Sequence, residues 1–312
     1  MVNSIAVRSK KRRRHFKRFL PGYIMLLPGF LLTLVFSYIP FGGLYMAFSN
    51  FRLGFPIFSA EFVGLQHIRT VFFESMEVRW VLRNTLVMNI GGLLVGLPSA
   101  MFFAIALNEV RVKSVKVVFQ TFSFMPFLLS WVVAYNMILA FLATEEGIIN
   151  VALRNWGIIE HGIPIMSDPR FSWGLIILSS LWKGLGYGAV LFLSAIAGID
   201  QELYDAAQVD GATRLQQAWH ITVPYLLPTL QILLILNTGW ILSSSLEQFY
   251  LFTNTMNRST MEVFDVYIMR FGLRLLRFSF ATAVGLMRSL VGITLLILVN
   301  IISSRINKVS VV

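Results

Sequence analysis

The most informative segment of this 312-residue chain is a polar, alanine-rich stretch, DAAQVDGATRLQQAWHITVPYLLP, between two long apolar runs. Alanine side chains allow another protein surface to approach closely, and glycine permits the backbone conformations of a sharp turn. The pattern predicts a compact protrusion that a partner protein binds. Its acidic and small residues form two triplets, Asp205-Ala206-Ala207 and Asp210-Gly211-Ala212.

Local signals predict that this protrusion is helical. Asp200 is placed to cap a short helix by accepting hydrogen bonds from free backbone N–H groups, with Glu202 in the favourable first turn. Leu203, Ala206 and Ala207 then share one face. The alternative is an amphipathic connector that lies at the membrane surface without a partner.

Two basic residues, Lys183 and Arg288, interrupt apolar runs. Charges within a membrane are costly and usually face the protein interior or water. They are therefore candidate ligands for an acidic sugar, for a carboxylate of a second subunit, or for an outer gate. The alternative is that both lie nearer the interface and extend their long stems towards it.

Polar and aromatic side chains gather in the fifth apolar run and at its end. Aromatic rings stack on the C–H faces of sugars, and amides and hydroxyls pair with sugar hydroxyls. This mixture suits an oligosaccharide path, although such residues are also common where membrane helices pack together. The candidates are Asn237, Trp240, Ser244, Glu247 and Gln248.

Other chemistry has little support. The chain has no cysteine, which excludes disulfides and thiolate sites, and its four histidines lie far apart without ligand spacing. We therefore expect no metal site and no catalytic residue.

The composition defines the elements that must position these residues. The chain is 56% hydrophobic and 13% charged, with a mean hydropathy of +0.72, whereas soluble domains carry about 25% charged residues. A spanning helix needs roughly 20 apolar residues. We expect an all-α integral membrane protein with six transmembrane helices, near 21–48, 84–107, 118–142, 172–196, 222–246 and 279–303.

These helices would form one transmembrane domain over residues 20–305, with the polar loop at 200–220 and short tails at 1–19 and 306–312. Eight Lys/Arg residues lie between Arg8 and Arg18, directly before the first run. The positive-inside rule places such a tail, and with six spans the polar loop, in the cytoplasm.

The polar segment at residues 205–228 resembles the EAA loop of binding-protein-dependent ABC importer permeases, which docks into the ATPase subunit. Ile221, Pro224 and Pro228 follow the two triplets at that family's spacing. Asp205 replaces the usual leading Glu. Ala218 stands where an aromatic is usual, with Trp219 next to it.

The resemblance covers roughly residues 20–305 and is closest to permeases of the carbohydrate-uptake group, in the branch for oligosaccharides and polysaccharides such as alginate. The segments that carry the resemblance include FVGLQHI (62–68), NTL (84–86), SW (130–131), WKGLGYG (182–188), AGIDQELYDAAQVDGA (197–212), LEQFYLF (246–252) and FSFATAVGL (278–286).

This resemblance implies a type I importer (MetI-like) fold in a bacterial cytoplasmic membrane. It also implies a second homologous permease, two cytoplasmic ATPases that use ATP and Mg, and an extracytoplasmic sugar-binding protein. The ATPase-docking role would fall on the two triplets of residues 205–207 and 210–212. The chain has no G-x-x-x-x-G-K-[ST] loop of its own.

Two other classes of protein remain as alternatives. A membrane-embedded enzyme of glycan or lipid metabolism would need convergent catalytic groups, and the acidic residues of the expected outer loops show no spaced motif. A sensor subunit would need a signalling domain, for which the sequence offers no candidate.

Overall fold

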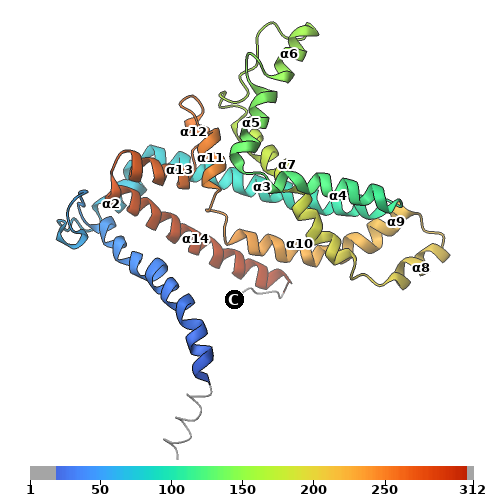
Figure 1. Cartoon of the computed structure of the whole chain (residues 1–312), viewed down its shortest axis with the longest axis horizontal. Coiled ribbons are helices and arrows are strands. Elements are labelled where there is room, and N and C mark those ends of the chain that lie inside the picture. Colours follow the sequence, from blue (N-terminus) through green and yellow to red (C-terminus); the bar gives the residue numbers. More distant parts are fainter. Residues whose placement is uncertain (1–18, 308–312) are drawn as a thin grey trace, which may run out of the picture.

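Long apolar runs fold into long helices because a backbone within a membrane must satisfy its own hydrogen bonds. The computed structural model describes residues 19–307, and the described chain is helical almost throughout (Figure 1). After a first helix over 19–33, the α-helices are α2 (Gln66–Arg69), α3 (Met76–Glu109), α4 (Lys113–Leu128), α5 (Trp131–Leu142), α6 (Ile148–Asn155), α7 (Ser172–Ile196), α8 (Gln201–Val209), α9 (Arg214–Gln217), α10 (Val223–Thr238), α11 (Leu246–Phe252), α12 (Arg258–Met261), α13 (Phe264–Met269) and α14 (Phe278–Asn307). Short 3-10 or π-helical turns cover Leu34–Tyr38, Ile39–Phe48, Ile57–Ser59, Thr70–Glu74, Ala218–Thr222 and Arg270–Arg274.

Five of the described helical stretches are long and apolar enough to cross a membrane, and a bent pair makes a sixth. The fourth expected span, 172–196, coincides with α7. The basic tail lies outside the described residues.

Two expected spans differ from the structure. The span expected over 118–142 is divided into α4 and α5, which meet at 106°. The span expected over 222–246 ends at Thr238, and an irregular stretch follows before α11 begins at Leu246. Neither run contains a charged residue, although Gly239 and three serines lie at the second break.

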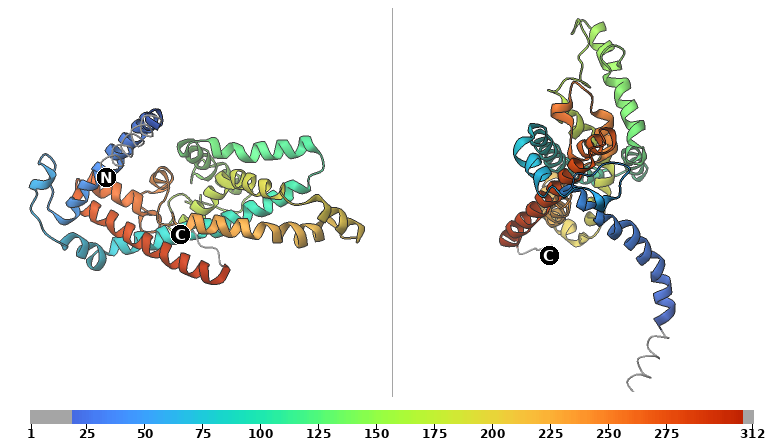
Figure 2. Two further views of the ribbon diagram at one scale, coloured as in Figure 1. Left: turned by 90° about the horizontal axis from the view of Figure 1, so that it is seen from below. Right: turned by 90° about the vertical axis from the view of Figure 1, so that its left-hand side faces the viewer.

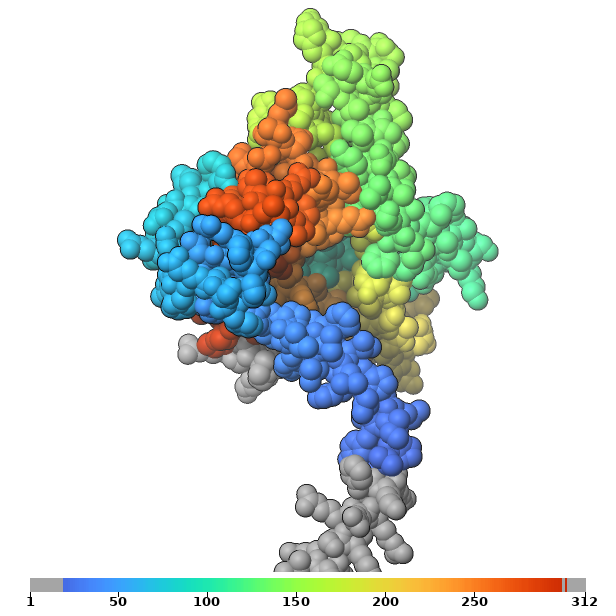
Figure 3. Space-filling model, turned by 60° about the vertical axis from the view of Figure 1, so that its left-hand side comes forward, coloured from blue at the N-terminus to red at the C-terminus, as the bar shows by residue number. Residues whose placement is uncertain are grey.

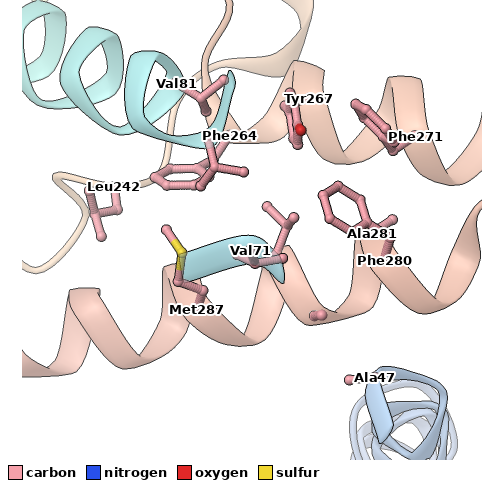
Figure 4. Close-up of a cluster of buried hydrophobic side chains, with 13 residues drawn as sticks. Ala47, Val71, Val81, Leu242, Phe264, Tyr267, Phe271, Phe280, Ala281 and Met287 are labelled. Atoms are coloured by element: carbon pink, nitrogen blue, oxygen red, sulfur yellow. The ribbon is translucent and has the colours of Figure 1, made fainter. Parts of the chain in front are cut away.

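The bundle is organised around α3, which packs along α7 and beside α4 and α10 (Figures 1 and 2). One buried cluster joins α3 to α13 and α14 through Val81, Phe264, Tyr267 and Met287 (Figure 4). Tyr267 lies against Phe271, with ring centroids 4.5 Å apart. The cluster also contains Leu242, so the stretch between α10 and α11 packs against α3.

The first span, Phe19–Phe48, leaves the bundle and is exposed along its apolar length (Figures 2 and 3). Its last part, Ile39–Phe48, packs on α14. There the Ser279 hydroxyl of α14 donates to the Ser49 carbonyl at 2.7 Å and accepts from the Phe51 N–H at 2.9 Å.

Close packing of α4 on α7 depends on Gly186, because a Cβ there would overlap the backbone of Ser123 and Phe124. We expect Gly186→Ala to destabilise the folded protein by about 1–3 kcal/mol, the cost of overpacking a tight contact. Thermal unfolding in detergent measures the effect. Gly184→Ala is the matched control, since a Cβ there meets no atom within 4 Å; equal melting temperatures would contradict the packing role.

Candidate functional site

The polar loop forms two short capped helices joined at a glycine corner. The Asp200 carboxylate accepts from the Glu202 N–H at 3.0 Å and begins α8. Thr213 begins α9 with a reciprocal capping box to Gln216. Between them Gly211 has φ +78°, a left-handed conformation that costs other residues about 1–2 kcal/mol. The predicted helix–corner–helix is confirmed.

Several apolar side chains of the loop are exposed. Val209 is 88% exposed and Leu215 is 78% exposed, and Leu203 and Trp219 are more than half exposed. Asp205, Asp210 and Gly211 are also exposed. The two triplets thus lie together at one end of the molecule (Figure 1).

Polar contacts hold this loop against the helices behind it. The Arg214 guanidinium of α9 lies 3.5 Å from the Glu109 carboxylate at the end of α3. The hydroxyls of Tyr204 and Thr222 are 2.8 Å apart, and Tyr225 donates to the Gly198 carbonyl. These contacts join the loop to the adjacent ends of α3 and α10.

At the other end of α10, the break over residues 239–245 borders a cavity of about 410 Å³ between α3, α7 and α10. Four of the sequence-predicted path residues share it: Asn237, Trp240, Ser244 and Gln248. Lys183, Glu247 and Arg288 do not line it. Glu247 is exposed at the start of α11.

Side chains of α3, α13 and α14 bond to the residues of the break. The Asn89 amide of α3 donates to the Ile241 carbonyl at 2.8 Å and to the Ser244 hydroxyl at 3.0 Å. The Asp265 carboxylate of α13 accepts from the Ser244 N–H at 2.9 Å. These bonds replace those that the missing helical turn would have made.

Arg288 of α14 completes this network. Its guanidinium donates to the Asp265 carboxylate at 2.6 Å and to the Ser243 hydroxyl at 2.7 Å. Both members of the ion pair are about one-fifth exposed, and both line a wider cavity of about 1030 Å³ beside α14. Arg288 thus neutralises Asp265, the acid that accepts the Ser244 N–H at the break.

Lys183 has a comparable place at the α4–α5 bend. Its ammonium donates to the Phe127 carbonyl at 2.8 Å, at the end of α4 where carbonyls lack helical partners. It also lies 5.4 Å from the Trp131 ring centroid. Gln248 is likewise bonded, since its amide donates to the Ser180 hydroxyl at 2.8 Å.

Sequence reasoning missed Asn89, Asp265 and Asn84 as site residues. The buried Asn84 amide donates to the carbonyls of Ser259 and Glu262, and thereby fixes α12 to α3. Polar residues inside the second apolar run were the available signal for Asn84 and Asn89. No group of three acidic or histidine side chains within residues 19–307 is placed to hold a metal.

We expect Asp265→Leu or Arg288→Met to destabilise the protein by up to about 3 kcal/mol, because each leaves the other charge unpaired in a poorly hydrated site. The double variant should be more stable than either single variant. Thermal unfolding tests this, with Ser289→Ala on the exposed face of α14 as the control. Strictly additive losses would argue against a coupled pair.

Comparison with known proteins agrees with this architecture. Residues 92–308 match the family described as the binding-protein-dependent transport system inner membrane component. Protein LplB of Bacillus subtilis (strain 168) is 36% identical over 286 residues, covering 92% of this chain and 89% of that protein. The polygalacturonan/rhamnogalacturonan transport system permease protein YteP of the same organism is 34% identical, covering 97% and 95%.

A solved structure is also similar along the whole chain. A chain of the bacterial ABC transporter involved in the import of the acidic polysaccharide alginate superposes with a TM-score of 0.84, at 32% identity, over 95% of this chain and 99% of that one. A chain of a bacterial alginate ABC transporter in complex with an alginate pentasaccharide-bound periplasmic protein superposes with the same TM-score, over 96% of this chain and 99% of that one. Together with the membrane-spanning helices, these matches show that the chain belongs to the family of binding-protein-dependent transport system inner membrane components, the permeases of ABC importers.

Proposed function

We propose that this chain is one permease half of an ATP-driven importer of oligosaccharides or polysaccharides. It works with a second homologous permease, two ATPase subunits and an extracytoplasmic sugar-binding protein. The observation that carries the proposal is the α8–α9 loop, with its capped helices, its Gly211 corner and its uncovered apolar side chains. These features suit docking into an ATPase.

The α8–α9 loop and the N-terminus face the cytoplasm in this proposal. The eight basic residues before the first span favour that orientation. The loop is then on the side where ATP is available.

Transport proceeds by alternating access. Closure of the ATPase dimer pushes on α8 and α9, and the Arg214–Glu109 contact passes the displacement to α3. The same helix carries Asn89 at the break. Movement of the loop therefore reaches the cavity as a rigid-body rotation rather than a local change.

The substrate contacts proposed for the path are the polar and aromatic side chains at the α10–α11 break, Asn237, Trp240, Ser244 and Gln248. Lys183 and Arg288 each bond a protein oxygen at one of the two breaks, and their remaining N–H donors keep them among the proposed path residues. Glu247 is exposed beside the cavity and would meet sugar or binding protein. The relatives named for pectic polysaccharides and for alginate favour a saccharide substrate.

The alternative of a membrane-embedded enzyme is overturned by the family match, since the family and its relatives are transport components.

Gly211→Val should reduce sugar uptake at least tenfold while membrane insertion is unchanged, because a β-branched residue is strained at φ +78° and would displace α9 from its docking position. Asp210→Lys should have a similar effect by reversing a charge on the docking surface. Uptake of labelled oligosaccharide by cells or proteoliposomes measures the result.

The matched control is Gly54→Val, which places the same strain at φ +96° in a loop far from α8. We expect this variant to retain most of the uptake. Wild-type uptake in both Gly211→Val and Asp210→Lys would refute the docking assignment.

A further inference from the structure

A separate polar cavity of about 380 Å³ lies among α11, α12, α13 and the Arg270–Arg274 turn. The helices that line it, α11 to α13, lie well away from the α8–α9 loop (Figure 1). None of its lining residues lines the cavity at the α10–α11 break. Its polar lining includes Tyr250, Thr253, Arg258, Glu262, Arg270 and Arg274.

The lining of this cavity carries an excess of positive charge, with three arginines and one acid. Its one acid, Glu262, is bonded to Arg270 at 2.7 and 2.9 Å, and Arg270 also reaches Glu77 at 2.9 Å. Burial raises the pKa of Glu262. Arg258 and Arg274 form no ion pair with any acidic side chain in residues 19–307. An anion would therefore find two unpaired guanidinium groups at this site.

The cavity also offers groups that suit a sugar. The Arg274 guanidinium lies over the Tyr250 ring, 5.2 Å from its centroid, and donates to the Tyr250 hydroxyl. That hydroxyl retains its own proton to donate. The Thr253 hydroxyl donates to the Phe249 carbonyl at 2.6 Å and keeps a lone pair to accept. A planar guanidinium stacked on a ring is held ready for a two-point contact with a carboxylate.

Buried asparagine side chains bond the backbone that forms the walls of the cavity. Asn257, almost fully buried, donates to the carbonyls of Phe252 and Met166. Asn84 holds the far side through the Ser259 and Glu262 carbonyls. Little ordering would accompany binding, which lowers its entropic cost.

From these observations we propose that the cavity binds the carboxylate of a uronic acid unit as an acidic oligosaccharide enters the permease. The proposal rests on the proposed function of sugar import. An acidic side chain of a docking protein carries the same carboxylate, but would leave the free proton of the Tyr250 hydroxyl and the free lone pair of the Thr253 hydroxyl unused. The sugar therefore fits the whole lining better.

The test uses the absence of native cysteine. In the assembled importer, with the partner ATPases and second permease, Thr255→Cys places a thiol on the cavity lining, where Thr255 is exposed. The rate of maleimide labelling of this chain is followed without binding protein. We expect millimolar trigalacturonate to slow labelling at least threefold. Its methyl ester, of similar size but uncharged, should have little effect.

Adding Arg274→Gln and Arg258→Gln to Thr255→Cys should remove the protection. The matched control is Arg277→Gln, because Arg277 lies over Phe271 and Phe280 and does not line the cavity. The proposal would be overturned by equal protection from the ester, by protection that survives loss of both arginines, or by no protection at all. If the same importer still transports a neutral oligosaccharide, such a result rejects this site and leaves the proposed function intact.

Discussion

The structure depends on one constraint, namely that backbone groups freed by a break in a membrane helix must find partners inside the protein. Two spans are broken. At the bend between α4 and α5, the Lys183 ammonium binds the Phe127 carbonyl. At the gap between α10 and α11, Asn89 binds the Ile241 carbonyl and Asp265 binds the Ser244 N–H. Charges inside the bundle are therefore used to hold irregular backbone.

This constraint connects the two ends of the molecule. Because α10 stops at Thr238, the chain leaves a space that a continuous helix would fill, and the cavity borders that space. Helix α3 contacts Arg214 at one end and bonds the α10–α11 break through Asn89. Further along the same helix, Asn84 bonds the backbone beside the polar cavity among α11, α12 and α13. One helix thus contacts the α8–α9 loop, lines the cavity at the α10–α11 break and bonds the backbone of the segment that carries the lining of the second cavity.

Most of the architecture could be predicted from sequence, because hydropathy and spacing report it directly. The six apolar runs locate the spans, and Asp200 and Gly211 locate the helix–corner–helix. The breaks were not predicted because neither run contains a charged residue and several of the stabilising side chains lie far away in the sequence, such as Lys183 for the Phe127 carbonyl and Asn89 for the Ile241 carbonyl. Gly239 and the serines at 243–245 were the available signal for the second break. Arg288 was recognised as unusual, but its partner Asp265 lies in a loop that the sequence places outside the span.

Hydrogen exchange of the Asn89→Leu variant tests most directly whether side chains hold the breaks. Loss of the Asn89 side-chain amide removes its bonds to the Ile241 carbonyl and the Ser244 hydroxyl. The backbone N–H groups of residues 239–245 should therefore exchange at least tenfold faster, while those of α10 exchange at an unchanged rate. Asn136→Leu is the control, because that amide bonds only the Val132 carbonyl of its own helix. Unchanged exchange over 239–245 in the Asn89 variant would contradict the account.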